Sequence, residues 1–533
     1  SHLRRSLDRA RRVLGRMSRR LTIAERADGR AEVAPIEPRA GAVRGLHDFR
    51  VGRDAFVYDT RSGLFFEADR LAVDIVEWLR GGASGSGLDV LRMNHDPEQV
   101  SEALREVSVL AGVGKDTGRG SGARALFTMV GRALDRAGGP SLSGIAAVAL
   151  NVAGGCNLSC DYCYLGREPQ SSLLMSDDTA RRAIDLLMAE SFGERIVSVV
   201  FFGGEPLLNP GLIVRTADYA RLRAGATGRD VSFHITTNGT LLTREVAEML
   251  HAAEVHVLVS IDGAAAAHDA HRSFPDGAGS YRGIVENIRG LPEGMRPGAR
   301  ATVSEDSAPL KEIVAHLKGL GFGVVHMAPV SGAAMTDEFA ERLVREYEDL
   351  ARMELAAIRG GESPSAGCFI EPVLGLELGR QRLAPCGAGA RYVSVDHDGR
   401  LFLCHRFAGD ARHCVGDVVG GLDRFEVGRL LDGLAEKSAG CSDCWALGLC
   451  GGACFHDVEN DPGATAGPGS ARCRVTGRIL ELSMWLYASL PAARRARLTE
   501  VARLAARPEI AAARVSGERH GGRLVGVNRD EGR

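Results

Sequence analysis

Three features that would place a protein in a membrane, in a secretory route or on a polyanion are missing from this chain of 533 residues. It has no uninterrupted apolar run of about 18 residues, which a membrane-spanning helix would need. It shows no signal-peptide pattern, and its formal net charge of −2 gives no overall preference for nucleic acid or acidic lipid. With 45% hydrophobic and 25% charged residues the composition is that of an ordinary globular protein. We therefore expect a cytoplasmic protein with several domains and no membrane partner.

The 12 cysteines are the most informative residues that are present. In a reducing compartment, clustered thiols bind metals more often than they pair. Cys156, Cys160 and Cys163 form a C-x3-C-x2-C loop after the apolar run 146–152. Thiolates this close can each take a different iron of one [4Fe–4S] cube, which leaves the fourth iron without a protein ligand. A structural zinc site would need a fourth Cys or His nearby, and none lies within ten residues of the loop.

This spacing resembles the signature of the radical SAM enzymes. The resemblance implies that the open iron chelates S-adenosylmethionine and that an electron from the cluster cleaves it to methionine and a 5′-deoxyadenosyl radical. Tyr162, just before the third cysteine, matches an aromatic position that packs near the adenine.

Alternating strand and helix patterns follow from residue 145. Helix starts are expected at Ser176 and Thr243, which have the residue type of N-caps. The pattern predicts α/β structure with a parallel sheet, and the resemblance makes it a partial (β/α)6 barrel whose functional residues lie at the carboxyl ends of strands. The expected strands are 146–152, 197–202, 231–235, 255–261, 299–303 and 324–328.

Short motifs follow these strands at the same end. The resemblance implies that they contact S-adenosylmethionine. For Ser260 and Asp262 the alternative is purely structural, namely a strand end followed by a turn. The resemblance assigns no catalytic residue, and Arg272 receives no role. The predicted cofactor-binding residues are Tyr162, Gly203, Gly204, Glu205, Pro206, Asn238, Ser260 and Asp262.

Seven further cysteines form a C-terminal array that exceeds one zinc ribbon. The array resembles the SPASM extension of radical SAM enzymes, which implies two auxiliary [4Fe–4S] clusters and three in all. The outer cluster would be held by Cys441, Cys444, Cys450 and Cys473, and the inner one by Cys386, Cys404 and Cys454. The inner set is one ligand short, so that Cys368 or Cys414 completes it or one iron stays open.

The N-terminal part reads as a separate module. A hairpin over 56–59 and 64–67, followed by amphipathic helices, resembles the winged-helix-like peptide-recognition domain fused to peptide-modifying radical SAM enzymes. A basic arm with eight arginines between Arg4 and Arg20 precedes it, for which a transit peptide, a nucleic-acid arm and a solvated helix are alternatives. The predicted divisions are 1–46 (arm and linker), 47–115 (peptide recognition), 116–144 (linker), 145–335 (barrel), 336–485 (bridging helix and SPASM) and 486–533 (helix and tail).

Together these resemblances favour a maturase that installs a thioether in a ribosomally made peptide or small protein subunit, like the quinohemoprotein amine dehydrogenase maturation type. The alternatives are a side-chain oxidase of the anaerobic sulfatase-maturating type, a carbon–carbon crosslinking maturase and an iron–sulfur DNA-binding regulator. A SAM pocket argues against the regulator, so nucleic acid is not an expected partner. The expected partners are a precursor peptide, bound through its leader or N-terminal region, and an electron donor such as flavodoxin or ferredoxin.

Overall fold

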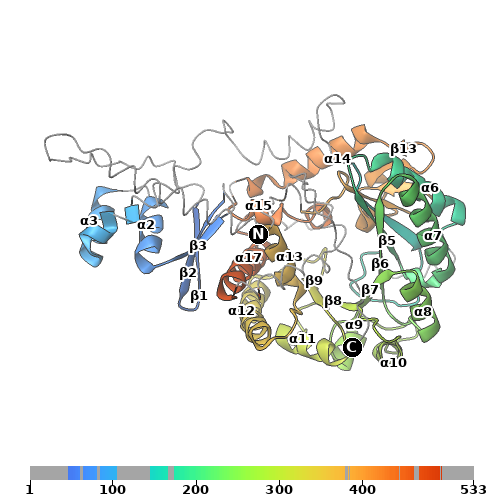
Figure 1. Cartoon of the computed structure of the whole chain (residues 1–533), viewed down its shortest axis with the longest axis horizontal. Coiled ribbons are helices and arrows are strands. Elements are labelled where there is room, and N and C mark those ends of the chain that lie inside the picture. Colours follow the sequence, from blue (N-terminus) through green and yellow to red (C-terminus); the bar gives the residue numbers. More distant parts are fainter. Residues whose placement is uncertain are drawn as a thin grey trace, which may run out of the picture.

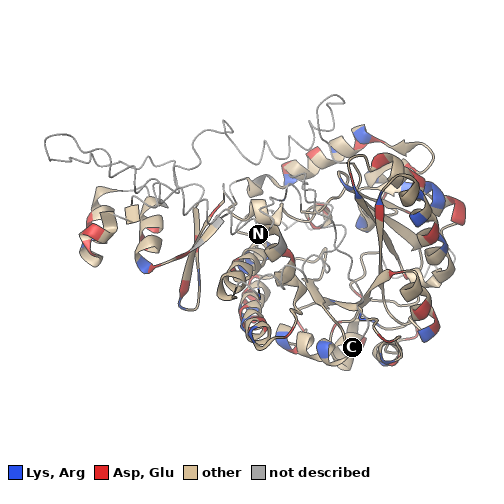
Figure 2. Cartoon of the chain, in the orientation of Figure 1, with Lys and Arg blue, Asp and Glu red and all other residues tan. Residues whose placement is uncertain are grey.

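The computed structural model describes residues 46–60, 64–80, 84–101, 103–104, 144–165, 173–377, 382, 385–442, 444–460, 467, 469–491 and 494. The predicted basic arm, nearly all of the 116–144 linker and nearly all of the C-terminal helix and tail lie outside these residues. No helix among the described residues is long and apolar enough to cross a membrane. Acidic and basic residues are mixed along the outer helices (Figure 2).

A parallel sheet flanked by helices forms the centre of the molecule (Figure 1), which confirms the predicted α/β fold class. All seven residues of its first strand are buried, as expected for a parallel strand covered on both faces. The six parallel strands are β4 (Ala147–Ala153), β5 (Ile196–Gly203), β6 (Asp230–Thr237), β7 (Val255–Ser260), β8 (Gly298–Val303) and β9 (Val325–Pro329).

The connecting helices begin at capping residues that the sequence already indicates. Ser176 and Thr243 each accept a backbone hydrogen bond in the first turn of the helix that follows, at 3.1 and 3.3 Å. Gly361, with φ of 101°, ends the long bridging helix in the left-handed conformation that glycine tolerates. The helices are α6 (Asp177–Glu190), α7 (Pro210–Ala226), α8 (Arg244–Ala252), α9 (Ala265–His271), α10 (Tyr281–Arg289), α11 (Leu310–Gly319) and α12 (Asp337–Gly360).

The Cys-rich region joins the same sheet instead of forming a separate layer. Strand β10 (Tyr392–Val395) pairs in parallel with β4, and Tyr392 is opposite Ala147. Antiparallel β11 (Arg400–Phe402), β12 (Cys414–Asp417) and β13 (Gly421–Leu422) follow, which gives ten strands in one sheet. The helices of this region are α13 (Gly367–Glu377), α14 (Arg424–Lys437), α15 (Leu447–Cys450), α16 (Phe455–Asn460) and α17 (Ala471–Ser489). The sequence did not predict this junction, because two to four residues per strand give too short a pattern to recognise.

The N-terminal module is a three-stranded antiparallel sheet, β1 (Leu46–Val51), β2 (Asp54–Asp59) and β3 (Leu64–Ala68), followed by α2 (Arg70–Arg80) and α3 (Gly85–Asn94). Alternation along the strands gives the sheet two apolar faces. Leu46 and Val57 pack with α2, whereas Phe49, Phe56 and Tyr58 belong to the main core.

Specific contacts attach this module to α17 and to the Cys-rich region (Figure 1). His47 stacks on Trp445 with 3.7 Å between ring centroids and an interplanar angle of 4°, and its Nε2 lies 2.8 Å from Oε1 of Glu481. Trp485 Nε1 donates a 2.9 Å hydrogen bond to Asp54. The module is therefore packed against the residue that follows Cys444 and is part of the folded body.

Candidate functional site

The first group of thiols lies on the loop that follows β4. Electrostatic interactions couple Cys160 to Cys156 on one side and to Cys163 on the other. Burial raises the pKa of Cys156 to about 12, although donors from Leu158 N (3.4 Å) and Asn238 Nδ2 (3.6 Å) oppose the shift. Buried thiols of this kind become thiolates when a cationic centre replaces the proton.

The loop after β5 is held against this first loop by backbone contacts. The N–H groups of Gly204 and Glu205 donate to the carbonyls of Ala153 (2.8 Å) and Gly155 (2.9 Å). A Cβ on Gly204 would lie 2.2 Å from the Gly155 carbonyl oxygen, and Gly203 has φ of 126°. Only glycine allows this close approach of two backbones.

Glu205 is a buried brace between the loops after β5 and β6. Its carboxylate accepts hydrogen bonds from Leu207 N (2.9 Å), the Thr237 hydroxyl (2.7 Å) and Asn238 N (2.7 Å). Burial raises its pKa to about 7, and these three donors oppose the rise. Both carboxylate oxygens of Glu205 thus accept hydrogen bonds from the chain. The side-chain Nδ2 of Asn238 donates to Cys156 Sγ and to Asn157 Oδ1 (2.8 Å). Pro206 begins a short 3-10 helix, Pro206–Leu208.

A buried ion pair that sequence reasoning missed joins the loop after β7 to Arg272, the residue that follows α9. Arg272 Nε donates to Asp262 Oδ2 at 2.8 Å, the Tyr162 hydroxyl donates to the same oxygen, and Thr302 N donates to Oδ1 at 2.8 Å. Burial alone would raise the pKa of Asp262, but the Arg272 charge and these donors hold it below its ordinary value.

The Arg272 guanidinium also lies 5.2 Å from the centre of the Tyr162 ring and interacts with the Cys160 thiol. Ser260 ends β7, two residues before Asp262. Arg272 therefore connects the first thiol group to the loop after β7. The available signal was a His-x3-Arg pattern that begins at His268, five residues after Gly263, and it says nothing about burial.

The inner group brings Cys386, Cys404 and Cys454 together. Burial raises the pKa of Cys404, and the other two thiols raise it further. Arg406 donates to Cys454 Sγ at 3.8 Å. A buried cation of this kind stabilises neighbouring thiolates.

The two spare cysteines have surroundings of their own. Cys368 lies on α13, where it interacts with Glu354 and with Tyr347. Cys414 begins β12, and its thiol donates to the Gly416 carbonyl at 3.5 Å. None of these contacts involves a cysteine of the inner group. We therefore assign three cysteines to that group.

The outer group lies where Cys441, Cys444 and Cys450 meet the start of α17. Burial, together with the neighbouring thiols of Cys473, Cys450 and Cys444, raises the pKa of Cys441 to about 11. Electrostatic interactions link cysteines within each of the three expected sets. The assignment of these sets to three clusters stays a prediction. Among the described residues, no three Cys, His, Asp or Glu side chains converge tightly enough for a single metal ion.

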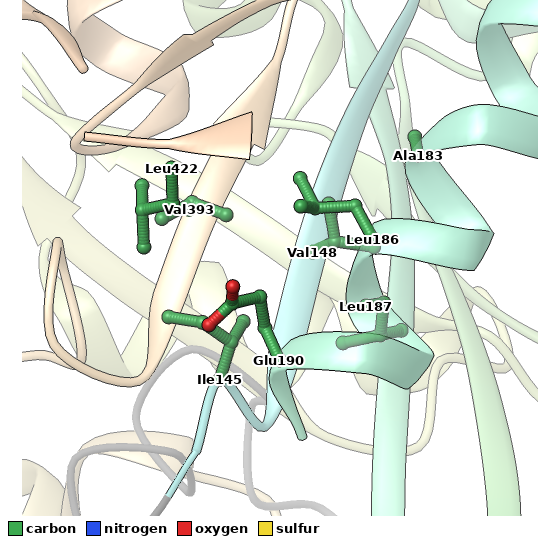
Figure 3. Close-up of a pocket in the computed structure, with 8 residues that line it drawn as sticks. All are labelled: Ile145, Val148, Ala183, Leu186, Leu187, Glu190, Val393 and Leu422. Carbon is green, nitrogen blue, oxygen red and sulfur yellow. The ribbon is translucent and has the colours of Figure 1, made fainter. Parts of the chain in front are cut away.

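A small cavity lies at the seam between β4, β10, β13 and α6, away from these groups (Figure 3). Its lining is apolar apart from Glu190, whose carboxylate pairs with Arg424. No lining residue belongs to a thiol group, so we interpret it as a packing seam between the barrel and the Cys-rich strands.

We expect Gly204→Ala to lower 5′-deoxyadenosine formation by ~10²-fold, because the added Cβ forces the two loops apart and misplaces whatever they hold. High-performance liquid chromatography of the reconstituted, dithionite-reduced protein measures this. Gly225→Ala is the matched control, since nothing lies within 4 Å of a Cβ there. Normal activity of Gly204→Ala would contradict the close-approach argument.

Comparisons with known proteins agree with this geometry. Residues 150–304 match the family model described as the radical SAM superfamily. The serine-type anaerobic sulfatase-maturating enzyme of Bacteroides thetaiotaomicron is 33% identical over 29% of this chain and 38% of its own length. The mycofactocin maturase MftC of Mycobacterium tuberculosis is 28% identical over 56% of this chain and 75% of its own length.

A solved structure, native anSMEcpe with bound AdoMet and the Cp18Cys peptide, superposes with a TM-score of 0.54. It covers 67% of this chain and 99% of its own, at 18% identity, which shows a shared fold. The chain spans less than two thirds of the length of several curated relatives that it matches, between 33% and 61%.

Proposed function

We propose that this chain, whose residues 150–304 match the family model of the radical SAM superfamily, is a SPASM-type maturase that closes a thioether within a ribosomally made peptide or small protein subunit. The observation that carries this proposal is the division of ten cysteines into a loop group of three, an inner group of three and an outer group of four. The similarity to two maturases supports a peptide or protein substrate.

The residues around the first group fit one cluster and S-adenosylmethionine, which when bound would supply a 5′-deoxyadenosyl radical. Cys156, Cys160 and Cys163 would hold the cluster. The Gly203–Pro206 turn, together with Tyr162, Asn238 and Ser260, would hold the nucleoside and methionyl groups. Glu205 and Asp262 would act by fixing these loops, because their carboxylates already accept hydrogen bonds from the chain.

Binding of a substrate thiol is the proposed role of the inner group. Three cysteines and a buried Arg406 beside Cys454 suit a centre that takes its fourth ligand from outside and needs it as a thiolate. Closing a thioether between that sulfur and a carbon removes two hydrogens from the peptide. One would leave as a hydrogen atom that converts the 5′-deoxyadenosyl radical to 5′-deoxyadenosine. The other would leave as a proton together with one electron, for which a cluster held by the auxiliary cysteines would be the acceptor.

The N-terminal module would bind the precursor through an edge of its three-stranded sheet, by main-chain pairing with the leader. One face of this sheet is already covered by α2 and the other contributes to the main core. The strand edges are therefore the surfaces of this sheet that are suited to a peptide. A ferredoxin or flavodoxin would supply the electron for each turnover.

We expect the reconstituted protein to bind about 12 irons and to convert a Cys-containing precursor into a product about 2 Da lighter per crosslink. The product cysteine should resist iodoacetamide, because its sulfur is then bonded to carbon. Iron analysis and mass spectrometry measure both.

Other outcomes separate the alternatives. A lighter product whose thiol still alkylates indicates carbon–carbon crosslinking, or an oxidase like the sulfatase-maturating enzymes. About four irons with stoichiometric zinc would overturn the auxiliary clusters.

A further inference from the structure

Tyr164, the residue after Cys163, has a buried hydroxyl oxygen with no hydrogen-bond partner. Leaving a buried donor unpaired is unfavourable, and such groups in folded proteins are uncommon. A tyrosine hydroxyl carries its proton at neutral pH, so this group is a donor. Its position therefore requires an acceptor that the polypeptide does not provide.

The side chain lies between the first thiol group and the inner one. Its hydroxyl interacts electrostatically with Arg406, Cys163 and Cys404. These residues come from both thiol-bearing regions. The ring centre is 5.9 Å from that of His456 and 6.3 Å from that of His405. His405 directly follows Cys404, and His456 lies two residues after Cys454, so both belong to segments of the inner group.

Arg406 makes the charge of this region suitable for an anion. Its Cζ lies 5.9 Å from the centre of the Tyr164 ring, and its Nη1 donates to Cys454 Sγ and lies 3.5 Å from Asp457 Oδ1. Asp457 offsets the charge of Arg406, so the three thiolates that would adjoin this pair leave the region with excess negative charge. A neutral O–H donor beside them lowers the cost of the excess negative charge without adding a further ion.

We infer that the Tyr164 hydroxyl donates a hydrogen bond to an anionic sulfur at the inner group. The acceptor is either a sulfide or thiolate sulfur of the cluster itself or the thiolate of a bound substrate. This inference rests on the proposed function, because it assumes that the inner group holds a cluster. Tyr164 is then a positioning residue that connects the site of radical formation to the site of thiol binding.

Replacement of Tyr164 by Phe tests this, because it keeps the ring and removes only the donor. Hydrogen bonds to sulfur raise the reduction potential of an iron–sulfur cluster by stabilising its more negative reduced form. In the anaerobically reconstituted full-length chain, we expect Tyr164→Phe to lower one auxiliary potential by about 59 mV. This equals a tenfold shift of a one-electron equilibrium. Redox titration followed by electron paramagnetic resonance measures the shift, without and with 2-mercaptoethanol as the thiol probe.

The outcomes are distinct. A shift without the probe identifies the cluster sulfur as the acceptor, and a shift only with the probe identifies the bound thiolate. Tyr281→Phe is the control, since that hydroxyl already has His316 as a partner at 2.7 Å, and it should leave every potential unchanged. Unchanged potentials in Tyr164→Phe, with full iron content and auxiliary signals present, overturn the inference alone. Absence of any inner-cluster signal in the unmodified protein overturns it together with the proposed cluster set.

Discussion

The variant with Cys156, Cys160 and Cys163 all replaced by Ala should produce no 5′-deoxyadenosine above the level of a protein-free control. The three thiols are the only cysteines on the described part of the loop after β4, and their mutual interactions place them around one site. Their loss removes every protein ligand that this loop offers to iron. Chromatography after reduction with dithionite in the presence of S-adenosylmethionine gives the measurement.

The same variant should retain most of the auxiliary absorbance, with an iron content near eight per chain if each auxiliary site holds a cube of about four irons. Cys414→Ala is a suitable control, because it removes a thiol outside all three groups. Its 5′-deoxyadenosine formation should equal that of the unmodified protein. Residual 5′-deoxyadenosine in the triple variant would show that S-adenosylmethionine is cleaved elsewhere.

A second large effect is expected from Arg272→Met, which should lower the free energy of unfolding by roughly 3–5 kcal/mol. Asp262 and Arg272 are 4% and 8% exposed, and the substitution leaves the carboxylate buried without its cation. Thermal unfolding of the two proteins under identical anaerobic conditions measures the loss.

The contribution of Asp262 to the pH dependence of stability should also have the opposite sign in the variant. In the unmodified chain the pKa of Asp262 is held below its ordinary value, so its contribution to stability is present at neutral pH and is lost as the pH falls below about 4. Without Arg272, burial raises that pKa, and the variant becomes less stable as the pH rises above about 4. The double variant Asp262→Asn/Arg272→Met should recover much of the loss, because no charge is then buried. Equal stability of the single and double variants at pH 8 would contradict the buried-charge explanation.

Strand and helix periodicity predicted the central fold well because each βα unit is defined by local pattern. Strand β4 was expected at 146–152 and lies at Ala147–Ala153, and the bridging helix expected within the 336–485 segment lies at Asp337–Gly360. The grouping of the thiols could likewise be inferred from spacing and resemblance.

Contacts between distant segments could not be inferred in this way. Asp262 and Thr302 meet because β7 and β8 are neighbours, yet they are 40 residues apart. Glu205 could be recognised as part of a motif, but its three hydrogen bonds to neighbouring loops are visible only after folding. The roles inferred for Arg272 and Tyr164 depend on their burial and on whether they have hydrogen-bond partners. No local sequence pattern encodes either property.

The pairing of β10 with β4 has a consequence for how this enzyme can be divided. Without residues 385–422, the first barrel strand would expose a row of unpaired N–H and C=O groups over Ala147–Leu150. Such an open strand is a template for intermolecular pairing and aggregation. A fragment that ends at the predicted barrel boundary of residue 335 would therefore be aggregation-prone even with every residue of the first thiol group in place. The Cys-rich region thus also covers the edge of β4 that would otherwise be open to such pairing.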